Sequence, residues 1–328
     1  MNQVLAKLKL KDGTPMEVRV VVAPDPEYGE AIVKWLGHKG APWIRHLGLV
    51  FAGLPEEGNR PGLECRFYLG LIDGQIAGNV STFEGRGCGI LGHVFTTPAH
   101  RRRGVCTNLM KVVMDDVRGR GIRAMTLGTT YNSPAYHIYE SFGFRAVIAG
   151  SGSMRWEADE GFIADAYTAA PARWREPRWS DWPAMSVLFS IGEGDWIRNV
   201  EHRRFGPTDF EEGFLRDRMN PDTPGVVSCV LETTRGGIVG YARVYPEKQW
   251  SGLRRQLDFF THPAFREEIL ELRQCVPWPA GKMQTCAATR DLDIIGVLQR
   301  AAFVPEATLH GLIASPWGPL DVLILATY

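Results

Sequence analysis

The sequence has few of the features that would tie a chain to metal, membrane or nucleic acid. Its six cysteines lie far apart and form no C-x-x-C pair, so neither a metal site nor a disulfide framework is expected. With 37 basic and 37 acidic side chains, the formal net charge is zero, and nucleic acid is not an expected partner. The amino-terminal segment lacks an apolar signal region, and no later run has the length of a membrane span, so no membrane partner is expected. These absences favour a reduced, cytoplasmic location.

Length and composition favour two globular domains. The 328 residues are about twice the size of a typical domain, and 45% hydrophobic with 23% charged residues is ordinary for a folded chain. We expect a first domain at 1–158, a connector at 159–172 and a second domain at 173–328, in which the pattern of the first is repeated. The segment LQRAAF at 298–303, for example, parallels YESFGF at 139–144.

Hydrophobic periodicity predicts a mixed α/β fold, with a mixed sheet flanked by helices. The runs 65–72 and 75–83 are typical of a hairpin, because Asp73-Gly74 between them suits a tight primed turn. A strand at 88–97 then leads into a long helix, in which apolar residues recur at helical spacing. Further strands are expected at 16–23, 124–129 and 144–148, and further helices at 24–36, 133–141 and 182–189.

The most informative segment is VFTTPAHRRRGVCTNL, at 94–109, where a strand passes through three arginines into a helix. The first N–H groups of a helix have no intrahelical partner, and the helix dipole places partial positive charge there. A diphosphate fits this geometry, and Gly104 permits a close approach of the backbone. An ordinary surface turn with clustered arginines is the alternative interpretation.

Two motifs in this region resemble those of the GNAT superfamily of N-acetyltransferases. Arg101-x-x-Gly104-x-Cys106 is similar to the R/Q-x-x-G-x-G/A signature that binds the pyrophosphate of coenzyme A in that family. The segment 132–144, NSPAYHIYESFGF, resembles the second motif, N-x-x-A-x-x-x-Y-x-x-x-G-F, at the right distance and in the right order. Cys106 departs from the pattern, since the family has Gly or Ala there.

The resemblance implies two tandem acyl-CoA N-acyltransferase domains and acetyl-CoA as co-substrate. In the family, the strand before the loop splays from its neighbour, and its free backbone groups bind pantetheine and the acetyl carbonyl. Backbone amides of the loop then hold the pyrophosphate. The residues that match these cofactor-binding positions are Val94, Phe95, Thr96, Arg101, Arg102, Arg103, Gly104, Val105, Cys106 and Thr107.

Two residues of the second motif also match functional positions. Tyr139 corresponds to the tyrosine that donates a proton to the departing thiolate, a task that suits a phenol protonated at neutral pH. The alternative is an aromatic anchor that packs the helix on the sheet. Asn132 corresponds to an asparagine that helps bind the cofactor, and its alternative is a simple position before the helix.

The general base is left open between His93, Glu84 and water. His93 lies on the strand that leads to the loop, but its position relative to Thr96 turns it to the other face unless a bulge intervenes. Glu84 ends the preceding strand, where an exposed carboxylate is the expected state. His100 is expected beside the phosphates and His137 on the helix surface or in the core.

The second half is expected to have lost coenzyme A binding. Ile269 stands where Gly104 stands in the first half, and Glu267 and Glu268 replace two arginines. Leu298 likewise occupies the Tyr139 position. The sequence therefore predicts an N-acetyltransferase that moves an acetyl group to a primary amine of a small molecule, by direct attack in a ternary complex, as a monomer or homodimer. The alternatives are a non-catalytic acyl-CoA-binding sensor or scaffold, and transfer of a longer acyl group.

Overall fold

The chain folds into two compact units. A computed structural model describes residues 2–53, 62–247, 254–276, 278 and 281–328. Unit 1 comprises Met1–Phe162 together with Trp179–Val187, and unit 2 comprises Ile163–Arg178 together with Leu188–Tyr328. The expected boundaries did not anticipate that a segment of the second half belongs to unit 1. Periodicity shows that a helix has an apolar face but not which sheet covers that face.

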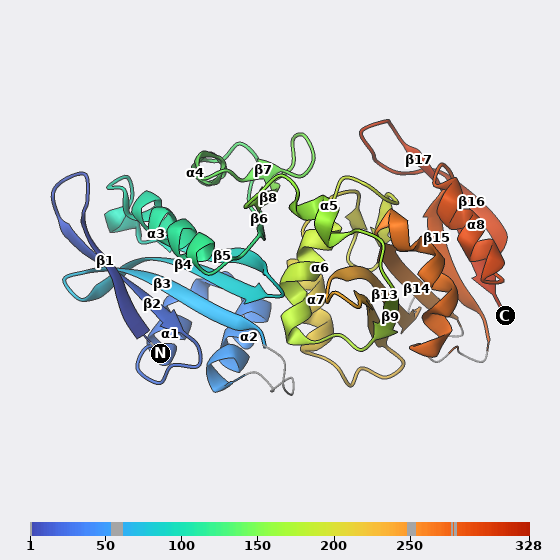
Figure 1. The fold of residues 1–328 in the computed structure, drawn as a ribbon, viewed down its shortest axis with the longest axis horizontal. Helices are drawn as coiled ribbons and strands as arrows, with labels where there is room; N and C mark the ends of the chain where they lie inside the picture. Colours follow the sequence, from blue (N-terminus) through green and yellow to red (C-terminus); the bar gives the residue numbers. More distant parts are fainter. Residues whose placement is uncertain (1, 54–61, 248–253, 277, 279–280) are drawn as a thin grey trace. The chain divides into compact units, whose positions relative to one another are not determined.

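Unit 1 is built on an eight-stranded mixed sheet with the order β1-β2-β3-β4-β5-β6-β8-β7 (Figure 1). Neighbouring strands are antiparallel except β5 and β6, which are parallel. The strands are β1 (Asn2–Lys9), β2 (Pro15–Val22), β3 (Glu64–Ile72), β4 (Gln75–Gly85), β5 (Cys88–Thr96), β6 (Ala124–Gly128), β7 (Arg145–Ala146) and β8 (Ser153–Glu157).

Helices cover both faces of this sheet. Figure 1 shows α3 on one face and α1 and α2 on the other. The α3 face holds the main core, in which Tyr68, Val80, Leu109, Met110 and Val113 are buried. The helices are α1 (Gly29–Trp35), η1 (Gly37–Lys39), α2 (Ala41–Ala52), η2 (Pro98–His100), α3 (Val105–Gly119) and α4 (Pro134–Ser141).

The expected hairpin is confirmed, but three elements of unit 1 were missed. Asp73 and Gly74 both have positive φ, 49° and 76°, as a primed turn requires. β1 was missed because the apolar run 4–6 interrupts its alternation, and α2 lies in a stretch without a diagnostic pattern. β8 forms inside the expected first domain, where no strand was predicted, and the expected strand 144–148 shortens to β7.

Unit 2 repeats the plan of unit 1 strand by strand. Its seven-stranded sheet has the order β16-β17-β15-β14-β13-β12-β9, and only β14 and β15 are parallel. This matches β7-β8-β6-β5-β4-β3-β2 of unit 1, so the internal repeat is present in the fold. The strands are β9 (Ala172–Arg175), β12 (Val227–Thr233), β13 (Ile238–Pro246), β14 (Arg255–Thr261), β15 (Met283–Ala288), β16 (Val304–Ile313) and β17 (Leu320–Thr327).

The remaining elements of the chain follow β8, and β10 pairs with β11 as a separate ribbon. η4 and α8 contribute to a core that includes Leu257, Ile269 and Leu298. The elements are α5 (Phe162–Ala166), η3 (Trp179–Asp181), α6 (Trp182–Phe189), β10 (Ile197–Asn199), β11 (Arg204–Phe205), α7 (Glu211–Arg218), η4 (Pro263–Gln274) and α8 (Leu292–Arg300), of which α5, η3 and α6 fall wholly or partly in unit 1.

A disulfide joins Cys229 on β12 to Cys275 at the end of η4. This corrects the expectation that no cysteines pair. The two cysteines are 46 residues apart in the chain and meet in the core of unit 2. Their spacing matches no short cysteine motif, so the pairing could not be predicted from it. No helix in the described ranges is long and apolar enough to cross a membrane.

Candidate active site

The loop before α3 has the backbone form that an anion site needs. Arg102 adopts a left-handed φ of 61° and Gly104 one of 91°, and Gly104 is the N-cap of α3. No side chain of the described residues caps this end, which leaves the first-turn amides for a ligand. A Cβ at Gly78 of β4 would come within 2.7 Å of Val105 Cγ1, so this glycine lets α3 begin close against the sheet.

The three arginines of the loop have different surroundings. Arg101 Nε donates to the Thr96 carbonyl at 3.1 Å. Arg103 Nε donates to Asp12 Oδ2 at 2.6 Å, and this contact is the main reason why the pKa of Asp12 falls to about 2. Arg102 is exposed, and the described part of the chain records no partner for its guanidinium. Arg101 and Arg103 thus make hydrogen bonds within the protein, whereas the Arg102 side chain is exposed.

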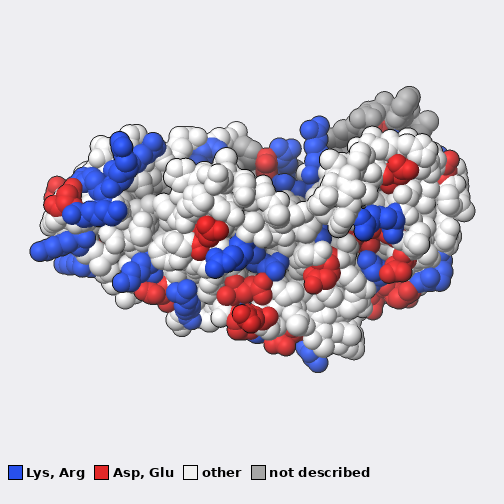
Figure 2. All heavy atoms as spheres, turned by 90° about the horizontal axis from the view of Figure 1, so that it is seen from above, with Lys and Arg blue, Asp and Glu red and all other residues white. Residues whose placement is uncertain are grey.

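The turn between β1 and β2 supplies a basic residue that sequence reasoning missed. Lys11 donates its backbone N–H to the Arg103 carbonyl at 3.2 Å, and its Cγ would lie 3.5 Å from a Cβ on Gly104. The Arg103 guanidinium also donates to Thr14 Oγ1 at 2.6 Å, which fixes the turn to the loop. Figure 2 shows Lys and Arg gathering at the end of unit 1 that carries β1 and the start of α3. Lys11 reaches the loop because β1 pairs with β2, and the sequence analysis did not predict β1.

β5 and β6 separate at the point where the loop region begins. Their recorded pairing runs only from Cys88–Ala124 to Ile90–Thr126 in the described strands. The carboxyl-terminal half of β5 therefore keeps β4 on one side and leaves the other edge without a strand partner. This divergence is the splay that the family resemblance implied.

The open edge of β5 can be assigned from its hydrogen bonds. Thr97 N–H donates to the Ala77 carbonyl of the β4 side at 3.0 Å, so alternation directs the main-chain groups of Val94 and Thr96 to the open edge. The Val94 carbonyl there accepts from Lys39 Nζ at 3.4 Å. The N–H of Thr96, rather than that of Phe95, consequently points to the open edge of β5, on the side where β6 diverges.

A β-bulge interrupts the pairing of β4 with β5 beside this edge. Asn79 pairs with Phe95, whereas Ser81 pairs with Gly92, so β5 carries one extra residue. His93 in the bulge has a φ of 51°, and its carbonyl accepts from Asn79 Nδ2 at 2.9 Å. Asn79 is fully buried and was missed as a supporting residue of the site.

The bulge places the His93 ring on the face that α1 and α2 cover. The ring lies 5.2 Å from Trp43 and 5.6 Å from Phe83, centroid to centroid. His93 Nε2 is buried and has no partner among the described residues. Burial, reinforced by the charge of Lys39, lowers the pKa of His93 to about 3, so the imidazole is neutral at physiological pH.

Glu84 is not an exposed strand-end carboxylate, which corrects the expectation for this candidate base. It is only 4% exposed, accepts from Thr82 Oγ1 at 2.5 Å and is held by Arg120 in a bidentate ion pair. Arg120 also donates to Asp116 Oδ2 at 3.0 Å and to the Tyr68 hydroxyl at 2.9 Å. This network ties the end of α3 to the sheet, and the carboxylate is committed to it.

Tyr139 lies in the main core of unit 1. It is 6% exposed and belongs to the same hydrophobic cluster as Val105, with Val94 and Cys106 packed against that cluster. Its ring meets Phe144 edge-on at 6.3 Å. One hydrophobic core thus includes residues of both motifs.

The remaining candidates lie outside this cluster. Asn132 has a φ of 57°, and its Oδ1 is 2.9 Å from Nε2 of the exposed His137, while Ser133 caps α4. Thr107 is exposed on the first turn of α3, and His100 is 2.8 Å from Thr97 Oγ1.

The Cys106 thiol packs against the core of unit 1. Burial raises its pKa to about 11, so the thiol is protonated at neutral pH and is not a nucleophile. In the described residues no group of His, Cys, Asp or Glu is placed to hold a metal ion.

The counterpart of the loop in unit 2 has a different structure. A 3-10 helix, η4, replaces α3, and the pairing of β13 with β14 is regular, without the bulge. His262 accepts from the Ala264 N–H at 3.2 Å, so a first-turn amide is already satisfied. Ile269 is buried at 3% exposure in the core.

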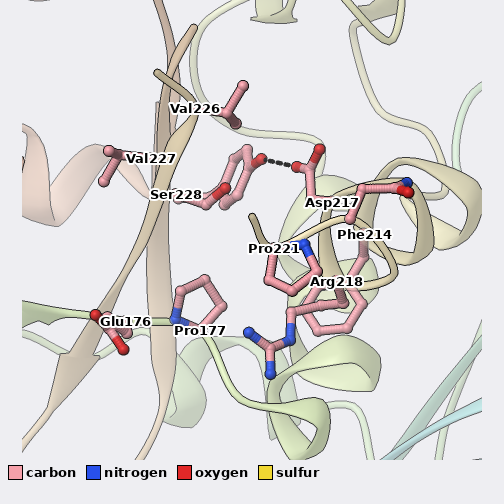
Figure 3. Close-up of a pocket in the computed structure, with 11 residues that line it drawn as sticks. Glu176, Pro177, Phe214, Asp217, Arg218, Pro221, Val226, Val227 and Ser228 are labelled. Carbon is pink, nitrogen blue, oxygen red and sulfur yellow. Dashed lines mark hydrogen bonds between the residues drawn. The ribbon is translucent and has the colours of Figure 1, made fainter. Parts of the chain in front are cut away.

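A cavity of about 260 Å³ lies in unit 2 between α7, β12 and β13 (Figure 3). Asp217 faces Tyr241, whose hydroxyl donates to Oδ2 at 2.5 Å, and Arg243 Nε pairs with the other oxygen at 3.0 Å. Tyr241 and Arg243 therefore already stabilise the negative charge of the Asp217 carboxylate. Glu176, Pro177, Phe214, Arg218, Asn220, Pro221, Val226, Val227 and Ser228 complete the lining.

One family model and several solved structures match part of the chain. Residues 41–144 match the model of the Acetyltransferase (GNAT) family. Solved structures with a similar fold each match about half of this chain. A GNAT superfamily phosphinothricin acetyltransferase from Sinorhizobium meliloti, in complex with AcCoA, is 14% identical over 48% of this chain and 87% of its own, with a TM-score of 0.39. An N-acetyltransferase from Staphylococcus aureus is also 14% identical, covering 48% and 98%, with a TM-score of 0.37. A spermidine N-acetyltransferase variant from Vibrio cholerae is 13% identical, covering 48% and 92%, with a TM-score of 0.37. No curated protein sequence matches the chain.

Proposed function

We propose that this chain, in which residues 41–144 form a GNAT acetyltransferase domain, transfers an acetyl group from acetyl-CoA to a primary amine of a small molecule. The observation that carries the proposal is the uncapped start of α3, which follows directly from a strand whose far edge is open. One feature suits a diphosphate and the other an extended amide chain, and coenzyme A contains both in succession.

The residues present fit this co-substrate. First-turn amides from Arg102 to Thr107 would hold the pyrophosphate, with Gly104 allowing close approach and Arg102 and Lys11 adding positive charge. The main-chain N–H groups of Val94 and Thr96 on the open edge would bind pantetheine and the acetyl carbonyl respectively, because their carbonyls already accept hydrogen bonds from Lys39 and Arg101. Phe95 would contribute its side chain rather than its amide to the site.

The transfer itself needs an acidic and a basic group. Tyr139 would protonate the departing thiolate, and the Thr96 N–H would stabilise the charge that develops on the carbonyl oxygen. His93 Nε2 is buried without a partner among the described residues, on the face that α1 and α2 cover, and would accept a hydrogen bond from the amine, directly or through water. Glu84 is engaged in its ion pair with Arg120, and the low pKa of His93 makes its ring a weak proton acceptor, so we expect water to take the proton.

The amine attacks the thioester directly, since the protonated Cys106 offers no covalent intermediate. One coenzyme A is expected per chain, in unit 1, because η4 lacks the free helix start of α3. Asn132 would need to exchange its contact with His137 for one with the cofactor. A cytoplasmic location, a monomeric or homodimeric state and a supporting role for unit 2 remain part of this proposal.

The decisive experiment compares the wild type with Tyr139→Phe. Acetyl-CoA affinity is measured by calorimetry, and turnover is measured as thiol release against a panel of amines. A fall in kcat of about 100-fold with unchanged affinity supports catalysis, in line with the usual contribution of a general acid. Tight acetyl-CoA binding without turnover of any amine would favour an acyl-CoA sensor instead.

A further inference from the structure

The face of unit 1 beside the open edge of β5 carries a cluster of rings, here called the aromatic wall, which comprises the half-buried Trp35, Trp43 and Phe95, the exposed His38 and the buried His93. Phe95 contacts Trp35 of α1 edge-on at 5.5 Å and His38 of η1 at 4.2 Å. Two residues earlier on the same strand face, His93 contacts Trp43 of α2 at 5.2 Å. A molecule that reaches the open edge from this side meets ring faces and edges.

Lys39 places an ammonium group at the same position. Its Nζ lies 3.4 Å from the Val94 carbonyl, which is a long bond for a charged donor. Lys39 is half-buried. Desolvation lowers the pKa of its ammonium group, and no carboxylate in the described ranges offsets this effect. A buried cation without a counter-charge is costly, and a bound anion would relieve that cost.

Two further polar atoms on the wall have no partner among the described residues. Trp35 Nε1 is a buried donor, and His93 Nε2 is a buried acceptor when its proton resides on Nδ1. Buried polar atoms in native proteins nearly always find a partner, so each of these two atoms is available to a ligand or to water. Lys39 and Trp35 Nε1 therefore offer a cation and a hydrogen-bond donor for an oxygen anion. His93 Nε2 offers an acceptor for an N–H group, and the rings of the aromatic wall offer a surface for an apolar group.

The geometry points to an amino acid with an aromatic or large apolar side chain as the acceptor, with its carboxylate on Lys39, its amine beside His93 and its side chain against the aromatic wall. This inference rests on the proposed function, since it names the amine that the site acetylates. The reaction transfers the acetyl group to the amine nitrogen and releases free coenzyme A, and the amine loses one proton to solvent. Polyamines and aminoglycosides are disfavoured, because Lys39 repels their cationic groups.

The test measures binding to the full chain in the absence of acetyl-CoA. L-phenylalanine, L-phenylalaninamide, 2-phenylethylamine and spermidine are titrated by calorimetry. We expect L-phenylalanine to bind at least about tenfold more tightly than the amide or 2-phenylethylamine, as one charge-assisted hydrogen bond predicts. Equal affinity for L-phenylalanine and its amide, or tighter binding of spermidine, overturns the inference.

Variants then assign the preference to Lys39. Lys39→Met should remove the difference in affinity between L-phenylalanine and L-phenylalaninamide, whereas Lys39→Arg should keep most of that difference. Lys34→Met, an exposed lysine on α1, should leave all affinities unchanged. Acetyl-CoA affinity should be unaffected in Lys39→Met, and a loss there would assign Lys39 to the cofactor and overturn the inference.

Thiol-release assays separate the two proposals. If L-phenylalanine binds as expected but no amine is acetylated, the proposed function fails, while the inference that Lys39 and the aromatic wall bind an amino acid of this kind holds. If other amines are acetylated and L-phenylalanine neither binds nor reacts, the inference fails and the proposed function holds.

Discussion

The Asn79 amide donates to the main-chain carbonyl of His93 at 2.9 Å, so a buried side chain on β4 holds the bulge that shapes β5. The bulge sits where β5 leaves β6, and it turns His93 toward the α1–α2 face. The same amide contacts Ser81 Oγ at 3.1 Å. A single asparagine therefore stabilises the local backbone on which the open edge depends.

Asn79→Ala should impair both stability and turnover. Losing this buried bond leaves the His93 carbonyl unsatisfied, which costs about 1–3 kcal/mol in the free energy of unfolding. The relaxed bulge should also lower kcat in the thiol-release assay. Asn220→Ala removes an exposed amide–carbonyl bond in unit 2 and serves as the control. If kcat stayed normal while stability fell, the bulge would have no part in the transfer.

Arg102 and Arg103 should respond differently to replacement by alanine. Arg102→Ala removes an exposed charge, so acetyl-CoA should bind about three- to tenfold more weakly, an effect that shrinks at high salt, with the melting temperature unchanged. Arg103→Ala breaks the contacts with Asp12 and Thr14 and should lower the melting temperature as well.

The control for this pair is Arg118→Ala, at the other end of α3, where Arg118 faces Asp115 on the exposed surface. Calorimetry with acetyl-CoA at two salt concentrations and thermal unfolding are measured for all three variants. Equal loss of affinity in Arg102→Ala and Arg118→Ala would mean that only overall charge matters.

The motif region could be predicted from the sequence because local chemistry determines it. Gly104 and the alternating strand 88–97 require nothing from distant residues, and the structure shows the helix start and the diverging strands there. The bulge at His93 depends on Asn79, fourteen residues away, and Glu84 is buried only because Arg120 reaches it from α3. Tertiary partners of this kind leave no periodic signal in a single sequence.

Acid should destabilise unit 1 through two buried histidines. Burial lowers the pKa of His46 to about 3, with His93 nearby adding to the effect, and the pKa of His93 is likewise lowered to about 3. Both rings stay neutral in the folded state but bind a proton near pH 6.5 once unfolded. Stability is therefore fully present above that pH and falls by about 1.4 kcal/mol per histidine for each pH unit below it, down to about pH 3.

His46→Phe tests this directly, since His46 packs among Phe83, Trp179 and Trp182 and neither ring nitrogen has a partner in the described residues. Urea unfolding between pH 5 and 8 should show a shallower acid slope in the variant. The exposed His137→Gln should leave the slope unchanged. A slope as steep as in the wild type would show that His46 titrates normally when folded.

Reduction should weaken unit 2 selectively. The Cys229–Cys275 bond closes a separation of 46 residues, which predicts a loss of about 2–4 kcal/mol when it is broken. Dithiothreitol should lower the unfolding temperature of unit 2 and leave acetyl-CoA binding in unit 1 intact. Alkylation of the unfolded, unreduced protein should label Cys65, Cys88, Cys106 and Cys286 alone. Labelling of all six cysteines would contradict the cross-link.

Unit 1 should depend on the segment Trp179–Val187, although that segment lies beyond the first half of the sequence. Trp182 is fully buried, its ring lies 5.1 Å from Phe83, and Ser186 Oγ accepts from Thr126 Oγ1 at 2.9 Å. A Cβ at Gly85 would lie 2.4 Å from the Ser180 carbonyl, so the segment packs tightly on the end of β4.

Trp182→Ala should therefore destabilise unit 1 by about 3–5 kcal/mol, as expected for a large side chain removed from a core. Urea unfolding followed by loss of acetyl-CoA binding reports on unit 1, and Trp317→Ala, at a position 62% exposed in unit 2, is the control. A chain ending at residue 178 should bind acetyl-CoA more weakly than one ending at 187, because only the longer chain covers Phe83 and His46. Equal stability of the two chains would show that unit 1 is complete without the segment and that the second repeat contributes nothing to its core.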